Sequence, residues 1–93
     1  MWIVRKPDGQ ISWLETGTTQ SGFEHIVNRH LSDFQEFGVY SETSLNTFLY
    51  STVSQNVPTQ ITATGQHIYT IAGKTLSIII GDNGYIVTAY PGT

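Results

Sequence analysis

The chain has 93 residues and no cysteine, and its four lysines and arginines stand against seven acidic residues for a formal net charge of −3. This length allows one domain with a single hydrophobic core, and the lack of cysteine excludes a disulfide framework or a cysteine-ligated zinc site. So few basic residues also exclude the large basic surface with which proteins hold long nucleic acids.

The first twenty residues have the pattern of a β-hairpin followed by a polar linker. Residues 2–5 and 11–14 are rich in strand formers, and Pro7-Asp8-Gly9 between them has turn chemistry, because proline sets φ and glycine allows a positive φ. This start is unlike a signal peptide, and no apolar run approaches the roughly 20 residues of a membrane span. We therefore expect one domain over residues 1–93, with residues 1–20 as hairpin and linker before a core of residues 21–91.

A first amphipathic helix is predicted from Gly22 to about Phe37. Ser21 is a plausible N-cap because Glu24 follows it three residues later, and Gly38 is a natural stop. One apolar arc recurs at the helical period and consists of Phe23, Ile26, Val27, Leu31 and Phe34.

His30 lies near the centre of that arc, whereas His25 points roughly the opposite way. A titratable ring on a core-facing stripe must find a partner, lose its charge, or face a cleft in which it works. From this position alone a structural histidine is the simpler interpretation. The two rings can share one pocket only if the helix ends early or the cleft wraps around its edge.

A second helix is predicted over residues 42–55, with Ser41 or Thr43 as its cap and Pro58 beyond its end. The period then changes to that of strands, which we expect at residues 60–64, 66–72, 74–80 and 85–90. Asn83-Gly84 is the strongest hairpin signal in the chain. The layout is an α+β fold: an N-terminal hairpin, two helices, then a four-stranded antiparallel sheet.

In the last hairpin, a loop with an even number of residues predicts one apolar face toward the core. That face consists of Leu76, Ile78, Ile80, Tyr85, Val87 and Ala89. Thr88 and Tyr90 then share the opposite face and present hydroxyl groups. An ordinary strand surface is the alternative for both residues, because threonine and tyrosine are good strand formers.

Residues 22–30, Gly-Phe-Glu-His-Ile-Val-Asn-Arg-His, resemble the G-F-x-H-I-x-x-R-H helix of small bacterial and phage toxin nucleases of the barnase, EndoU, colicin and RelE-like (BECR) superfamily. Residues 80–91 are similar to the closing hairpin of that group, and residues 34–55 are similar to the layout of colicin D-type tRNase domains. The resemblance covers about residues 20–91. It implies a BECR-like fold and metal-independent cleavage of RNA, often tRNA, by toxins used in bacterial competition or carried by phages.

In the reaction that this resemblance implies, a base removes the proton of a ribose 2′-OH, the oxygen attacks the adjacent phosphorus, and an acid protonates the leaving oxygen. It implies acid–base catalysis by His30, with His25 as second candidate, and contacts from Thr88 and Tyr90 to a phosphate oxygen. The residues expected to bind the substrate are Arg29, His67, Tyr69 and Lys74.

Two other interpretations stay open at this point. A catalytically inactive member with the same fold would act as a protein-interaction module, of immunity type or as a phage structural protein, for which low charge and exposed aromatic residues are normal. A metal site of His25, His30 and His67 has unfamiliar spacing, because an i, i+5 pair straddles a helix whereas metalloproteases use i, i+4.

We expect no metal or cofactor, RNA (above all tRNA) as substrate, a cognate immunity protein as partner, and no membrane partner. The expected site of action is the cytoplasm, after delivery as the C-terminal part of a secreted or phage-borne protein.

Overall fold

The computed structural model describes residues 1–93 and confirms the α+β class. Its elements are β1 (Trp2–Arg5), β2 (Ile11–Leu14), α1 (Phe23–His30), the 3₁₀ helix η1 (Leu31–Phe37), α2 (Glu42–Gln55), β3 (Gln60–Ile61), β4 (Gln66–Ile71), β5 (Lys74–Ile80) and β6 (Ile86–Pro91). β1 and β2 form an antiparallel hairpin, and the other strands form an antiparallel sheet in the order β3-β4-β5-β6. None of the helices is long and apolar enough to span a bilayer.

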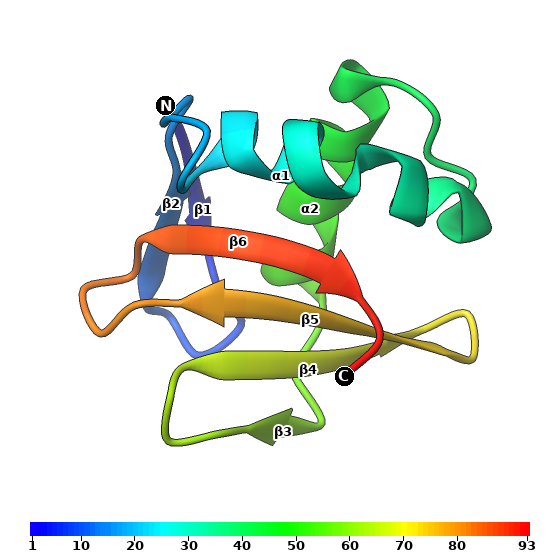
Figure 1. The fold of residues 1–93 in the computed structure, drawn as a ribbon. Coiled ribbons are helices and arrows are strands. Elements are labelled where there is room, and N and C mark those ends of the chain that lie inside the picture. Colours follow the sequence, from blue (N-terminus) through cyan, green and yellow to red (C-terminus); the bar gives the residue numbers. More distant parts are fainter.

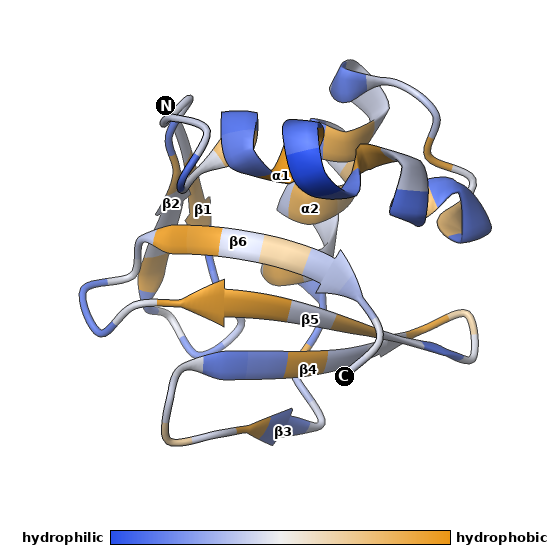
Figure 2. Cartoon of the chain, in the orientation of Figure 1, coloured by the Kyte–Doolittle hydropathy of each residue, from blue (hydrophilic) through white to orange (hydrophobic).

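The helices cover one face and one edge of the sheet (Figure 1). α2 lies behind the sheet, α1 runs along its β6 edge, and the β1–β2 hairpin stands at one end. One hydrophobic core joins these parts, with buried residues from both hairpin strands, both α-helices, η1 and three strands of the sheet. Val4 and Leu14 of the hairpin are only 2% and 3% exposed, so residues 1–20 are an integral part of the core rather than an appendage. Figure 2 shows α1 with a hydrophilic outer side and a hydrophobic side toward α2.

The first helix differs from its prediction at both ends. Its α-helical part stops at His30, whose φ of −133° and ψ of −4° are not helical, and η1 continues to Phe37. The apolar residues 31, 34 and 37 repeat every three positions, which is the period that aligns side chains in a 3₁₀ helix. Phe34 and Phe37 thereby both pack against Phe48 of α2, with ring centroids 6.0 and 5.2 Å apart.

The predicted cap of the first helix is also wrong. The N-cap is Gly22, and no side chain caps the helix. The polar linker does this instead, because the carbonyls of Glu15 and Thr16 accept hydrogen bonds from the first two helical N–H groups, each 2.8 Å long. Ser21 Oγ is 3.0 Å from the hydroxyl of Tyr85. For α2, by contrast, the predicted bounds and the cap by Ser41 are confirmed.

The final hairpin contains a β-bulge that corrects the predicted face. Ile79 pairs with Thr88, but Ile80 pairs with Ile86, so Val87 is an extra residue on β6. The core face beyond the bulge therefore carries Ile86, which is 2% exposed, in place of the predicted Tyr85 and Val87. Thr88 and Tyr90 keep their predicted face. β3 is shorter than predicted, because residues 62–65 form a turn closed by the Gly65 N–H and the Thr62 carbonyl.

Candidate functional site

His25 and His30 lie side by side at the edge of the sheet, with ring centroids 5.8 Å apart. On a regular helix, residues five apart point about 140° away from each other, which is why the sequence predicts opposed rings. That prediction is wrong because the helix ends at His30 and its backbone turns there. The early end brings two imidazoles together and leaves both partly accessible.

Each imidazole of the pair is oriented through its Nδ1 atom. His25 Nδ1 is 2.9 Å from the carbonyl oxygen of Thr19, and His30 Nδ1 is 3.2 Å from Oδ2 of Asp33. A carbonyl and an ionised carboxylate can only accept, so each Nδ1 carries the proton. Nε2 of either ring is then the free position, which is an acceptor in the neutral ring and a donor in the charged ring.

β6 completes this cluster with two hydroxyl-bearing side chains. The Tyr90 ring lies 5.7 Å from that of His30, and the side chain of His30 is 25% exposed. Thr88 lies two residues away on the same open face of the sheet, which is turned toward the viewer in Figure 1. The Thr88 hydroxyl oxygen is buried and has no hydrogen-bond partner within the protein.

The bulge on β6 holds helix α1 beside these hydroxyls. Its extra residue, Val87, accepts a 2.8 Å hydrogen bond from the N–H of Gly22, the N-cap of α1. Gly22 has a φ of 83°, and a Cβ there would lie 3.0 Å from the Glu15 carbonyl oxygen and the Tyr85 hydroxyl. The position of the histidines over Tyr90 therefore depends on a glycine and a bulge.

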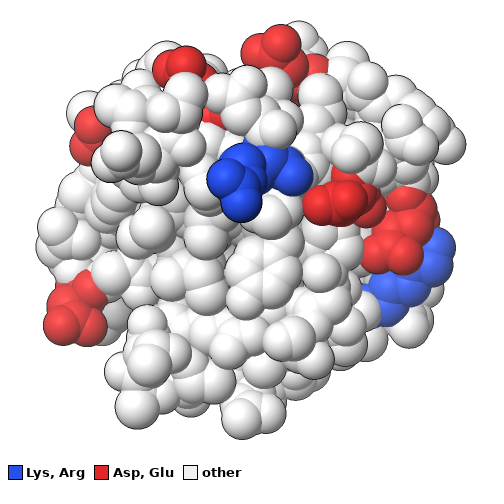
Figure 3. All heavy atoms as spheres, in the orientation of Figure 1, with Lys and Arg blue, Asp and Glu red and all other residues white.

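The two basic residues predicted to bind the substrate, Arg29 and Lys74, lie in different parts of the molecule. Arg29 is exposed in the last turn of α1, four positions after His25, a spacing that puts both side chains on the same side of the helix. Lys74 lies elsewhere: its Nζ donates to the Glu36 carbonyl and sits 5.9 Å from the ring centroid of Phe37. Figure 3 shows no charged side chains over the β4 and β5 part of the open face.

His67 and Tyr69 lie on the opposite face of the sheet, because His67 pairs with Ile78, which is fully buried toward α2. They are not part of the cluster around His30, contrary to the expectation that both bind the substrate there. His67 is 8% exposed and donates from Nδ1 to the Gly65 carbonyl at 2.9 Å. A metal site of all three histidines is thereby ruled out geometrically, and no other three His, Asp or Glu side chains converge.

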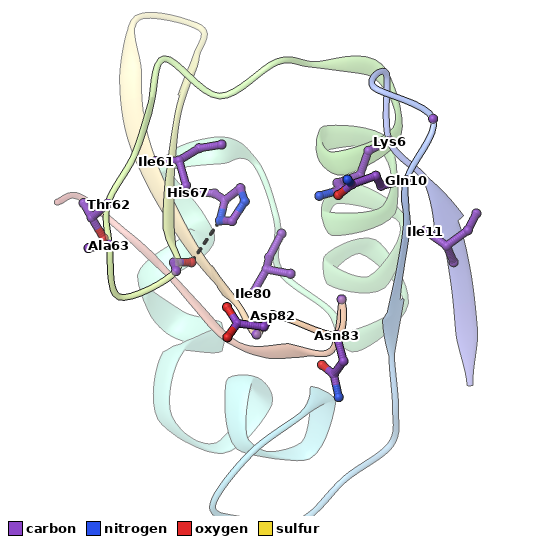
Figure 4. Close-up of a pocket in the computed structure, with 14 residues that line it drawn as sticks. Lys6, Gln10, Ile11, Ile61, Thr62, Ala63, His67, Ile80, Asp82 and Asn83 are labelled. Carbon is purple, nitrogen blue, oxygen red and sulfur yellow. Dashed lines mark hydrogen bonds between the residues drawn. The ribbon is translucent and has the colours of Figure 1, made fainter.

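A cavity opens beside His67, where three turns of the chain meet (Figure 4). It has a volume of about 580 Å³ and is bordered by the β1–β2, β3–β4 and β5–β6 turns. Lys6 and Gln10 project from the hairpin toward His67 and Ile61, with Ile80 between them. A second chamber of about 140 Å³ shares Lys6, Ile61 and His67 with the first, so the two adjoin.

Tyr69 borders the smaller chamber and is only 1% exposed. Burial, with a smaller contribution from Asp8, raises the pKa of Tyr69 to about 12. Its hydroxyl has no hydrogen-bond partner within the protein. The group therefore remains protonated at neutral pH, as an unpartnered hydroxyl enclosed by protein.

Two residues of these sites were not anticipated. Asp33 could have been found, because it follows His30 by three positions, a spacing that brings side chains together on a helix. Lys6 gave no signal, because a basic residue next to a turn is usually solvated, whereas its side chain is 12% exposed here.

Comparison with models of known protein families gives no match, and comparison with curated proteins gives none. The function therefore has to be argued from the geometry of the molecule.

Proposed function

We propose that the protein is a metal-independent endoribonuclease that cleaves RNA by attack of a ribose 2′-oxygen on the adjacent phosphorus. The observation that carries the proposal is the cluster of His25 and His30 beside Tyr90. Two imidazoles with free Nε2 atoms supply both a base and an acid, and this reaction needs no more than one of each.

His30 is the better general base of the pair. The Asp33 carboxylate beside its Nδ1 fixes the tautomer and stabilises the imidazolium that forms when Nε2 accepts the proton of the 2′-OH. As the 2′-oxygen bonds to phosphorus, the bond to the 5′-oxygen breaks, and His25 Nε2 donates a proton to that leaving oxygen. The products are a 2′,3′-cyclic phosphate and a 5′-hydroxyl end, so atoms and charge balance.

The transition state carries additional negative charge on the non-bridging phosphate oxygens. The hydroxyl of Tyr90 and the guanidinium of Arg29 are the donors near the histidine pair that would stabilise it, and the buried hydroxyl of Thr88 lies beneath the same face of β6. With a net charge of −3 the protein has little long-range attraction for RNA. A short stretch of RNA held at one place is the substrate that such a surface favours.

The proposal includes a toxin role of the BECR type, with tRNA as the main target, action in the cytoplasm of a recipient cell, delivery by a larger secreted or phage-borne protein, and a cognate immunity protein as partner. It rests on the likeness of residues 22–30 and 80–91 to that superfamily together with the histidine cluster.

The test is induced expression of the wild type and of His30→Ala in bacteria, with growth and total tRNA followed over time. We expect growth arrest and cleaved tRNA with the wild type only. Purified protein should cleave RNA in the presence of EDTA and leave 2′,3′-cyclic phosphate ends. Tyr50→Ala, which removes an exposed aromatic side chain of α2, is the matched control and should behave as the wild type. Intact RNA and normal growth with the wild type would overturn the proposal and favour an interaction module.

A further inference from the structure

The polar segment of residues 17–21 forms a tight loop in front of α1, beside the histidine pair. Thr18 and Ser21 form a bridge that closes the loop, in which the Thr18 N–H donates to the Ser21 carbonyl at 2.9 Å. The Gln20 N–H donates to the Thr18 hydroxyl at 3.1 Å. These bonds within the loop fix the direction of the Thr19 carbonyl relative to Ser21.

Only two hydrogen bonds connect this loop to the rest of the molecule. His25 Nδ1 donates to the Thr19 carbonyl at 2.9 Å, and Ser21 Oγ lies 3.0 Å from the Tyr85 hydroxyl. The first bond is exposed to water and the second is partly buried, so the second is the firmer attachment. The flanking residues are held by backbone bonds to α1 and β6, so loss of the Tyr85 bond should loosen the loop without unfolding it.

Tyr85 is itself held in place from the side of the hairpin. Its ring packs against that of Trp13, with centroids 6.2 Å apart, and the two residues bridge β2 to the start of β6. The Trp13 N–H donates to the Gly84 carbonyl, and its indole Nε1 donates to the Glu15 carboxylate. The half-buried Tyr85 side chain therefore presents its hydroxyl to Ser21 from a fixed base.

We propose that Tyr85 is a positioning residue for His25. Through Ser21 it holds the Thr19 carbonyl in line with the Nδ1–H of His25, and this sets the direction of Nε2. When the charged ring gives its Nε2 proton to the leaving 5′-oxygen, the neutral ring keeps the Nδ1 proton on the Thr19 carbonyl, so one tautomer results. The effect on catalysis rests on the proposed function, whereas the orientation of His25 does not.

Tyr85→Phe keeps the ring against Trp13 and removes the hydroxyl. At saturating substrate we expect it to cleave RNA about tenfold more slowly, because the acid is misplaced. Uridine 3′-(4-nitrophenyl phosphate) should be cleaved within about twofold of the wild-type rate, since its nitrophenolate leaves without a proton. Tyr40→Phe removes the hydroxyl of an exposed tyrosine and should change neither rate. Equal losses with both substrates in Tyr85→Phe would mean general damage and would overturn the proposal.

Ser21→Ala removes the other partner of the same hydrogen bond. If that bond carries the effect, Ser21→Ala and the double variant with Tyr85→Phe should each cleave RNA about as slowly as Tyr85→Phe alone. Losses that multiply in the double variant would show that the two hydroxyls act separately, contrary to the proposal.

Nitrogen-15 NMR spectra of the imidazoles test the geometry without any substrate. In the wild type, neutral His25 should carry its proton on Nδ1. In Tyr85→Phe and Ser21→Ala, a share of the Nε2–H tautomer that free histidine prefers should appear. His67, whose Nδ1 donates to the Gly65 carbonyl, is the internal control and should not change. An unchanged His25 tautomer in both variants overturns the proposal, whereas a wild type that cleaves no RNA refutes the proposed function alone.

Discussion

The two faces of the sheet carry histidines in opposite settings. At the α1–β6 edge, His25 and His30 are half-buried, and each has a protein acceptor for Nδ1 that leaves Nε2 open. On the α2 side, His67 is buried at the border of a cavity, and the hydroxyl of Tyr69 is enclosed by protein without a hydrogen-bond partner. The first setting leaves Nε2 open to proton exchange with a substrate from solvent, whereas the second keeps its polar groups away from solvent. Successive side chains of a strand point to opposite faces of the sheet, and this alternation is enough to separate the two groups of histidines.

The largest expected effect concerns His25, and it tests whether the edge cluster works as a pair. His25→Ala should lower the rate of RNA cleavage by about 100- to 10,000-fold, because proton transfer to the leaving oxygen is lost. The pH–rate profile, measured in single turnover, should be bell-shaped in the wild type. In the variant it should keep only the limb that reports the general base. The free energy of unfolding should stay within about 0.5 kcal/mol of the wild type, because His25 is partly exposed. A bell that survives in the variant would show that His25 is not the acid.

Alkaline unfolding tests the α2 side of the sheet through Tyr69. Because burial raises the pKa of Tyr69 to about 12, from an ordinary value near 10, the unfolded chain loses this proton first. The contribution of Tyr69 to stability is complete below about pH 10 and is lost as the pH rises to about 12. The free energy of unfolding should therefore decrease by about 3 kcal/mol over this range. Urea unfolding of the wild type and of Tyr69→Phe at about pH 9 and about pH 11 should show about half of this decrease, roughly 1.4 kcal/mol, in the wild type only. An equal loss in both proteins would assign the effect to other groups.

Gly22→Ala is expected to damage the edge cluster more than the cavity. A side chain at this φ is strained and meets the Glu15 carbonyl, so the free energy of unfolding should fall by about 2–3 kcal/mol. Gly38→Ala is the matched control: it has a similar φ of 79° but open space around it, and about 1 kcal/mol is expected. Chemical denaturation measures both. RNA cleavage should fall in the first variant well below the temperature at which it unfolds.

The smallest effect is expected for Asp33, which is a positioning residue for His30. Asp33→Asn should lower cleavage only about tenfold, because this carboxylate is exposed and water screens its charge. The loss should fall on kcat and leave KM unchanged, because Asp33 orients His30 and does not contact the substrate. Asp33→Glu should restore part of the rate. A tenfold loss that falls on KM, with no rescue by glutamate, would mean a merely structural role.

Sequence patterns predicted the elements whose signals are local. Helix α2, with its cap at Ser41, and the hairpin at Asn83-Gly84 depend on neighbours in the chain, and both were found. The early end of α1 was missed because apolar residues at 31, 34 and 37 suit both an α-helix and a 3₁₀ helix, and packing against Phe48 decides between them. The bulge was missed because it depends on the distant bond between Gly22 and Val87.

For the candidate sites too, residues with local sequence signals were predicted, whereas features that depend on long-range contacts were not. Helical phase singled out His30, and likeness to a superfamily suggested His25, Thr88 and Tyr90, but helical phase placed His25 on the opposite side of the helix. The arrangement of the two histidines beside Tyr90 rests on the two features that were missed. Placing His67 required the pairing of β4 with β5, since a strand alone does not show which of its faces is covered. The burial of Lys6 depends on three turns that meet only in the folded chain.

The bond between Gly22 and the bulge at Val87 has a consequence for folding. It joins residues far apart in the sequence, and such contacts form only after a long loop has closed. α1 can become helical early, but its histidines meet Tyr90 only when β6 has paired with β5. A partly folded chain therefore lacks the complete cluster. The recovery of RNA cleavage during refolding would mark the docking of the last strand, at the end of the folding reaction.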